Sequence, residues 1–379
     1  MSSSTQRILA MHQPRRLVFG AGCVEQCARD LAEQNFKRIF LVTSPSTRRC
    51  CESLGQERFI WDQIKQEPTV ETFRQALAAA RDARPDAVIG LGGGSAMDVA
   101  KLVAAFLGSS QDIRQTFGIG KLAGRSTYLA CLPTTAGTGS EVSPNSILLD
   151  ESEQLKKGII SPHLMPDAAY VDPMLTLTVP PAVTAATGID ALTHCIEAYA
   201  NRFAHPMIDL YALQGIRLIS RSIAQAVQKG DDVEARTDLA LGSMYGGMCL
   251  GPVNTGAVHA LAYPLGGEFH IAHGVSNALL LTHVLEFNLP AAPQRYAEIA
   301  VALGCERGKD DTETAHRGLD RLRELCKQCA IPARLSELGI PESAIERMAR
   351  SAMTVTRLLE RNVRELKLED AIKIYRRAF

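Results

Sequence analysis

The sequence predicts an α/β domain followed by an all-helical domain, and two observations carry this prediction. Over residues 1–180, short β-branched runs alternate with helical segments, which is the pattern of a parallel α/β domain. From Pro181 onward, apolar residues recur with a period of about 3.6 over long segments, which is typical of helices. The length of 379 residues suits two domains. We therefore expect domains at residues 1–180 and 181–379.

The first domain has a regular alternation of candidate strands and helices. The strands, each ending in turn residues, read RRLVFGAG, KRIFLVTS, DAVIGLGGGS and STYLACLPTT. The helices read EQCARDLAEQ, TVETFRQALAAARDA and AMDVAKLVAAFL. Strands that are joined through helices pair in parallel, so the segment predicts a parallel sheet with helices packed on it.

The second domain follows a proline-rich boundary. The segment YVDPMLTLTVPPAV places Pro173, Pro180 and Pro181 close together, which marks the hinge between the two patterns. The helical segments that follow read AVTAATGIDALTHCIEAYA, PMIDLYALQGIRLISRSIAQAVQ, VEARTDLALGSMYGGMCL, ETAHRGLDRLRELCKQC and ESAIERMARSAM. No internal repeat is recognisable, and these segments predict one all-helical domain.

Composition excludes several classes of partner. Lys plus Arg and Asp plus Glu each number 41, so no net charge attracts nucleic acid or an anionic membrane. No apolar stretch is long enough for a membrane span, and MSSSTQRILAMHQPRR lacks the apolar core of a signal peptide. The ten cysteines are diluted over a long chain. We therefore expect a cytoplasmic protein with reduced thiols.

Four residues of the helical half have types and spacing that suit one metal ion. Asp190 and His194 are four residues apart with no Gly or Pro between them, so a helix places both on one face. His259 and His273 are separated by Pro264, Gly266 and Gly267, which predicts two consecutive elements that converge. Each histidine alone is more simply a packed or surface residue. Together, three imidazoles and one carboxylate favour Zn(II) or Fe(II).

Two loops of the α/β half predict a nucleotide site. In DAVIGLGGGSAMDVAK a strand, a glycine turn and a helix follow one another, so Gly92, Gly93 and Gly94 let the backbone approach a ligand and Ser95 can cap the helix. The helix amides then face an anion such as pyrophosphate. LPTTAGTGSEVSP follows the next strand and should open at the same carboxyl edge of the sheet. The alternative interpretation is that both segments are ordinary polar loops that bind no ligand.

The motifs together resemble the iron-containing, or group III, alcohol dehydrogenases. GGGSAMDVAK, PTTAGTGSEV, GIDALTHCIEAY and HALAYPLGGEFHIAHG occur in the order of that family, over about Leu17 to His283 and more weakly beyond. The resemblance implies a dehydroquinate synthase-like architecture, in which a dinucleotide-binding domain and a helical domain have the active site in the cleft between them. It also implies a homodimer or a larger homo-oligomer.

The resemblance also assigns roles to residues of this chain. It implies a metal held by Asp190, His194, His259 and His273. It implies cofactor contacts from Gly93, Gly94, Ser95, Asp98, Thr134, Thr135, Thr138 and Lys156, with Lys157 as a neighbour that makes the last alignment ambiguous. The implied reaction transfers hydride between NAD or NADP and a small alcohol, aldehyde or ketone. The divalent cation polarises the substrate oxygen.

Two departures from the family pattern affect the expected chemistry. Where relatives often carry a histidine one turn after the third ligand, this chain has Tyr263, which either relays a proton or packs beside Pro264; His270 is the other candidate. Where NAD-preferring relatives often have Asp, this chain has Ser44, followed by Arg48 and Arg49. Loss of that carboxylate makes NADP possible, although NAD remains the first expectation.

Three other functions compete with an alcohol dehydrogenase. A hydroxyacid–oxoacid transhydrogenase, or a reductase of small oxo acids, is compatible with Tyr263 and Pro264. A phosphate-eliminating synthase on the dehydroquinate synthase fold is less compatible, because its metal set resembles Glu, His, His. A non-catalytic module that binds nucleotide or metal is the remote alternative.

Overall fold

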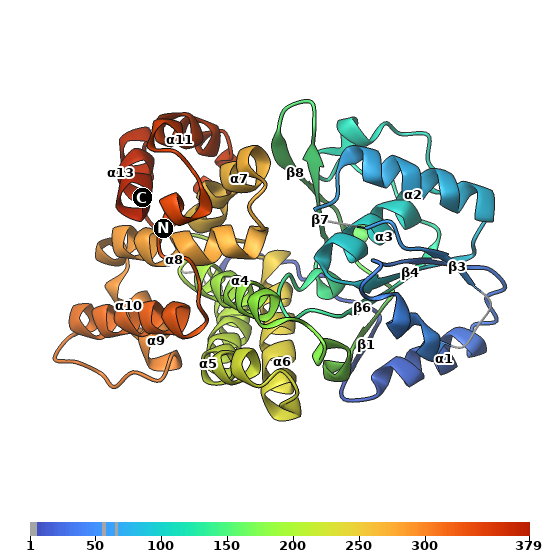
Figure 1. The fold of residues 1–379 in the computed structure, drawn as a ribbon, viewed down its shortest axis with the longest axis horizontal. Helices are drawn as coiled ribbons and strands as arrows, with labels where there is room; N and C mark the ends of the chain where they lie inside the picture. Colours follow the sequence, from blue (N-terminus) through green and yellow to red (C-terminus); the bar gives the residue numbers. More distant parts are fainter. Residues whose placement is uncertain (1–5, 55–57, 65–66) are drawn as a thin grey trace. The chain divides into compact units, whose positions relative to one another are not determined.

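The computed structural model describes residues 6–54, 58–64 and 67–379, and these form two compact units. Met11–Val179 make up the α/β unit, and Pro180–Phe379 make up the helical unit (Figure 1). Residues 6–10 belong to the helical unit, not to the unit that follows them in sequence. Arg7 accounts for this, because its guanidinium donates to the Phe203 carbonyl oxygen and lies 5.5 Å from the centre of the Phe203 ring.

The α/β unit contains, over the described residues, a six-stranded parallel sheet with the order β1-β9-β6-β4-β2-β3. Its strands are β1 (Arg16–Phe19), β2 (Ile39–Val42), β3 (Arg58–Trp61), β4 (Ala87–Gly92), β6 (Tyr128–Pro133) and β9 (Ala168–Val171). The predicted parallel sheet is thereby confirmed. All four predicted strands are present, whereas β3 and β9, each four residues long, were not predicted.

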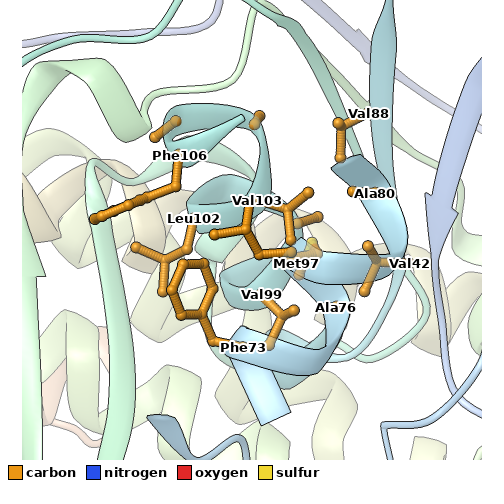
Figure 2. Close-up of a cluster of buried hydrophobic side chains, with 14 of the residues drawn as sticks. Val42, Phe73, Ala76, Ala80, Val88, Met97, Val99, Leu102, Val103 and Phe106 are labelled. Carbon is orange, nitrogen blue, oxygen red and sulfur yellow. The ribbon is translucent and has the colours of Figure 1, made fainter. Parts of the chain in front are cut away.

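Side chains of the central strands are apolar on both faces, because helices cover both faces. In β2, Phe40 and Val42 pack toward α2 (Val70–Ala83) and α3 (Gly94–Phe106). The alternate residues Ile39 and Leu41 pack with α1 (Cys23–Glu33) on the other face. Figure 2 shows the first cluster, in which the Phe73 and Phe106 rings meet edge to face at 5.2 Å. The buried helices hold the carboxyl ends of the strands in fixed positions.

A second, three-stranded sheet lies in the same unit and was not predicted. It contains β5 (Gly118–Ile119), β7 (Asn145–Asp150) and β8 (Leu155–Ile160), and β7 and β8 form an antiparallel hairpin. The burial along β7 alternates, which is the pattern of a strand with one face packed. Charged residues in LLDESEQLKK conceal this alternation in the sequence.

The second unit is helical throughout, as predicted. Its helices are α4 (Pro181–Tyr199), α5 (Pro206–Gln228), α6 (Val233–Leu250), α7 (Ala257–Phe269), α8 (His273–Asn288), α9 (Pro293–Ala302), α10 (Asp311–Gln328), α11 (Ile345–Met353), α12 (Thr356–Leu359) and α13 (Leu368–Ala378). In the part of the chain that the structure describes, no helix has the length and apolarity needed to cross a membrane.

Helix α7 differs from the sequence prediction in one respect. Pro264 and the two glycines after it were expected to interrupt the helix, but α7 continues through all three and ends only at His270, which has a φ of 56°. Every residue of α7 from Ala257 to Gly267 is buried. Tertiary packing therefore outweighs the local cost of a proline inside the helix. His259 and His273 still come from two consecutive elements, α7 and α8, as predicted.

Candidate metal centre and cofactor loops

Three helices of the helical unit bring the four predicted ligands together. Asp190 and His194 lie one turn apart on α4, whose residues from Gly188 to Tyr199 are all buried. His259 lies in the first turn of α7, and His273 is the first residue of α8. Helices α4 and α7 both pack against α8, so all four side chains lie within one core.

The three imidazoles converge on one carboxylate oxygen. Asp190 Oδ1 lies 3.6 Å from His259 Nε2, 3.9 Å from His273 Nε2 and 4.0 Å from His194 Nε2. Two ligand atoms that bind one zinc or iron ion at about 2.1 Å in a tetrahedral site are about 3.4 Å apart. The observed separations exceed this value by 0.2 to 0.6 Å. The ligand atoms of Asp190, His259 and His273 also all lie within 4.8 Å of one another, a set that does not include His194.

Burial and charge support the same interpretation. Asp190, His194 and His259 are at most 6% exposed in their side chains, whereas His273 is 28% exposed and leaves the centre accessible from its side. His259 Nε2 is buried and has no hydrogen-bond partner. A buried nitrogen of this kind normally has a partner, and a metal ion bound among these residues would supply one. The donor set, three nitrogens and one oxygen, therefore fits Fe(II) or Zn(II).

The pKa values of Asp190 and His259 are shifted by burial and by the charges of the groups around them. Burial alone raises the pKa of the Asp190 carboxyl, but the imidazoles of His194 and His273, with that of His259, hold this pKa well below its ordinary value. Burial lowers the pKa of His259, yet the carboxylates of Asp190 and Glu197, the second of which is hydrogen-bonded to Nδ1, raise it to about 9. The carboxylates therefore stabilise positive charge at this point.

Two further residues support the ligands and were not predicted. Asn277, one turn after His273 on α8, donates from Nδ2 to Asp190 Oδ1 at 2.6 Å. Glu197 lies one turn after His194 on α4 and accepts a hydrogen bond from the His259 ring. Both stand at helical spacing from a ligand, three or four residues on, and this spacing was the available signal. Their partners, however, are 62 and 87 residues away in the sequence.

The two candidates for proton transfer occupy different environments. Tyr263 is buried, and its ring centre lies 6.1 Å from that of His273. Burial raises the pKa of Tyr263, while the positive charge of the Arg357 guanidinium opposes this increase. His270 is exposed at the C-terminal end of α7. Of the two, Tyr263 is the residue that contacts the metal-binding cluster.

The first predicted cofactor loop joins β4 to α3 in the α/β unit. Gly92 has a φ of 156°, which only glycine adopts readily, and Gly93 is the N-cap of α3. Ser95 was expected to cap this helix and does not, because α3 begins at Gly94, two residues earlier than a helix capped by Ser95 would. The Ala96 amide donates to the Gly93 carbonyl oxygen at 3.1 Å, so the binding of an anion by the Gly94 and Ser95 amides stays a prediction.

The second loop follows β6 and lies directly beside the first. Gly92 pairs with Pro133 at the ends of β4 and β6, and the Thr134 amide donates to the Gly92 carbonyl at 2.9 Å. The predicted common edge is thereby confirmed. Thr134 Oγ1 is buried and has no hydrogen-bond partner, whereas Thr135 lies next to Gly93. This orphaned hydroxyl fits a polar ligand held between the two loops.

Thr138 and Asp98 fix the second loop against α3. A Cβ on Gly94 would lie only 2.5 Å from Thr138 Cγ2, so glycine is required for this close approach. Asp98 is directed into the unit, where its carboxylate accepts from Ser140 Oγ at 2.6 Å and from the Ile147 amide at 2.8 Å. Asp98 therefore attaches the second loop and the start of β7 to helix α3.

A fully buried lysine completes this support. Lys101 Nζ donates to the backbone carbonyls of Ser143 at 2.9 Å and Asn145 at 2.8 Å. Burial lowers the pKa of Lys101, although Asp98 and Glu141 oppose the shift. One turn of α3 thus carries two groups, a carboxylate and an ammonium, that hold the segment after β6.

The remaining candidates for cofactor contact already have partners. Lys156 on β8 is buried and ion-paired with Glu67. Ser44, after β2, shares short hydrogen bonds with Ser46 at 2.9 Å and Thr47 at 2.7 Å. Arg48, considered for a 2′-phosphate, forms an ion pair with Asp62.

Comparison with known families covers almost the whole chain. Residues 14–173 match the model described as "Iron-containing alcohol dehydrogenase". Residues 184–379 match "Fe-containing alcohol dehydrogenase family, C-terminal". Long-chain-alcohol dehydrogenase 1 of Geobacillus thermodenitrificans is 40% identical over 373 residues, which are 95% of this chain and 94% of that protein.

Solved structures show the same relationship. A crystal structure of a 1,3-propanediol oxidoreductase has a TM-score of 0.95 at 33% identity and covers 98% of this chain and 100% of its own. A sulfoacetaldehyde reductase from Bifidobacterium kashiwanohense, in complex with NAD+, has a TM-score of 0.88 at 26% identity, covering 98% of this chain and 99% of its own. The chain belongs to the iron-containing alcohol dehydrogenase family. It is accordingly an alcohol dehydrogenase, an oxidoreductase.

Proposed function

We propose that the protein is a metal-dependent, NAD(H)-linked dehydrogenase of small alcohols and aldehydes, with Asp190, His194, His259 and His273 as metal ligands. The convergence of three imidazole nitrogens on Asp190 Oδ1, all within 4.0 Å, carries this proposal. A bound Fe(II) or Zn(II) ion supplies Lewis acidity toward the substrate oxygen, while nicotinamide supplies the hydride chemistry.

The cofactor is proposed to bind at the edge where β4 and β6 end. The first-turn amides of α3 would hold the pyrophosphate, and Thr134 would supply a hydroxyl. NAD(H) is favoured over NADP(H), because the Arg48 guanidinium, which could bind the 2′-phosphate of NADP(H), is already paired with Asp62. The structural relative in complex with NAD+ supports the same choice.

Tyr263 is proposed to handle the substrate proton. Its ring centre lies 6.1 Å from that of His273, and a tyrosine hydroxyl can both donate and accept a hydrogen bond. The substrates are proposed to be small alcohols and aldehydes, as the name of the 1,3-propanediol oxidoreductase suggests. A cytoplasmic location and a homo-oligomeric state remain predictions, and sedimentation measures the second.

Metal removal and reloading test this proposal. Purified protein is treated with a chelator, its metal content is measured, and reduction of a panel of short aldehydes, ketones and oxo acids is followed with NADH and NADPH. We expect turnover to disappear with the metal and to return with Fe(II) or Zn(II). The variant Asp190→Asn should lose bound metal. Asp209→Asn, which removes a carboxylate paired with Arg295 in the same unit, should retain it.

Each alternative has a recognisable outcome. Full turnover in verified metal-free protein would falsify the metal-dependent mechanism. Cofactor that copurifies and does not exchange, with turnover only between a hydroxy acid and an oxo acid, would indicate a transhydrogenase. Absence of hydride transfer over the whole panel would indicate a module that only binds its ligands.

A further inference from the structure

Glu197 accepts two hydrogen bonds at the edge of the metal-binding cluster. Its Oε2 lies 2.6 Å from His259 Nδ1, and its Oε1 accepts from the Val258 amide at 2.6 Å. The side chain is 6% exposed, so water does not compete effectively for either oxygen. Because an ionised carboxylate only accepts hydrogen bonds, Nδ1 of His259 must carry the hydrogen.

We propose that Glu197 is the positioning residue of the metal centre, which selects the tautomer and the ring orientation of His259. This inference rests on the metal-dependent function proposed above. With the hydrogen on Nδ1, the lone pair of Nε2 is directed toward Asp190 Oδ1, 3.6 Å away. Metal-binding histidines commonly depend on such a partner on the second nitrogen, and its loss weakens metal binding.

The backbone at the start of α7 leaves space for the Glu197 carboxylate and donates a hydrogen bond to it. Gly256 is the N-cap of α7, and a Cβ at this position would lie 3.2 Å from Glu197 Oε1. The bond to Val258 satisfies an amide of the first turn of α7, which has no partner within its helix. Glu197 therefore anchors the start of α7 and, one residue later, the ring of the ligand.

Asn201 holds the end of α4 on which Glu197 lies. Its Nδ2 donates to the Glu197 backbone carbonyl at 3.1 Å and to the Asn254 carbonyl at 3.2 Å. Asn254 precedes α7, so this amide links the end of α4 to the chain that enters α7. These hydrogen bonds from the Asn201 side chain to two backbone carbonyls help to fix the Glu197 carboxylate relative to the His259 ring.

Glutamine is nearly isosteric with glutamate but cannot replace it at this position. The Val258 amide and the Nδ1 hydrogen of His259 are both donors, and Glu197 accepts from both. An amide side chain offers one acceptor and one donor. If its oxygen accepts from Val258, its NH2 group donates to Nδ1 and forces the hydrogen onto Nε2, which can then no longer bind the metal.

The first experiment compares metal affinity in Glu197→Gln, Asp209→Asn and the wild-type protein. Co(II) and Zn(II) are titrated into metal-free protein against a competing chelator. We expect Glu197→Gln to bind both ions about 10- to 100-fold more weakly, with kcat recovering at saturating metal more than affinity does. Asp209→Asn should bind as the wild type does. Wild-type affinity in Glu197→Gln would overturn the inference, whereas a wild-type protein that binds neither ion would overturn the proposed function itself.

The second experiment needs no variant, so a folding defect in Glu197→Gln does not prevent the test. ¹⁵N-histidine spectra of the zinc-loaded wild-type protein report which nitrogen of each ring carries hydrogen. We expect His259 to be protonated at Nδ1, with a hydrogen-bonded proton, and to bind zinc through Nε2. Zinc bound through Nδ1 of His259, or a proton on Nε2, contradicts the role given to Glu197.

Discussion

Ser140 donates its hydroxyl to the partly buried Asp98 carboxylate at 2.6 Å, and this bond ties the loop after β6 to helix α3. Ser146 donates to the same residue, but to its backbone carbonyl, at 3.1 Å. Both serines are buried. Substitutions of these two serines therefore allow a hydrogen bond to a carboxylate and a hydrogen bond to a backbone carbonyl to be compared at one residue, Asp98.

Ser140→Ala should destabilise the protein more than Ser146→Ala. The first variant leaves a partly buried carboxylate oxygen without its donor, which costs about 1–3 kcal/mol, whereas the second loses a neutral bond of about 1 kcal/mol. Urea unfolding measures both values. We also expect Ser140→Ala to raise the KM for NADH, because the second loop loses its attachment. Equal losses of stability in the two variants would show that the charge of Asp98 has no part in holding the loop.

Gly94→Ala should weaken cofactor binding without unfolding the protein. The added methyl group overlaps Thr138 Cγ2 at 2.5 Å, so either the loop or the helix must move. We expect the Kd for NADH to rise about tenfold, which corresponds to about 1.4 kcal/mol. Gly124→Ala is the matched control, because its Cβ would meet no atom within 4 Å. Combining Gly94→Ala with Thr138→Ala should restore part of the affinity; no recovery would place the cause outside this contact.

Glu141 should make stability depend on pH. Burial raises its pKa from an ordinary 4.5 to about 7. A raised pKa means that the folded state favours the neutral acid, so its contribution is complete below pH 4.5 and is lost as pH rises to 7. Glu141→Gln should therefore gain stability relative to the wild type by about 3 kcal/mol between pH 4.5 and pH 8. Unfolding curves over this range measure the difference, and a constant difference would refute the expectation.

Tyr263→Phe should lower kcat and leave metal binding intact. Phenylalanine keeps the ring beside His273 and removes only the hydroxyl that Arg357 contacts. Proton transfer by a positioned side chain contributes about 100-fold or more, so we expect a loss of at least about tenfold in kcat and an altered pH profile. Metal content is measured in parallel. An unchanged kcat would assign Tyr263 to packing and leave His270 as the remaining candidate.

Much of the metal centre was predictable because it depends on local periodicity. Asp190 and His194 share a face of α4 for the reason that the sequence indicates, namely a spacing of four residues. Pro264 shows the limit of this reasoning, since its local signal predicted a break and the buried environment of α7 overrode it. Ser95 shows another limit, because a shift of two residues in the start of α3 removes its capping role.

The sequence by itself determined the two-unit organisation, the parallel sheet, the family and the identity of the residues that converge on Asp190. These follow from periodicity and from motifs of adjacent residues, which local physics and chain order govern. Only the tertiary structure decided that Glu197 orients His259, that Asp98 holds Ser140, and that Lys156 is paired with Glu67. Each of these pairs joins residues at least 42 positions apart, and a contact across that separation depends on how buried elements pack, which no local pattern encodes.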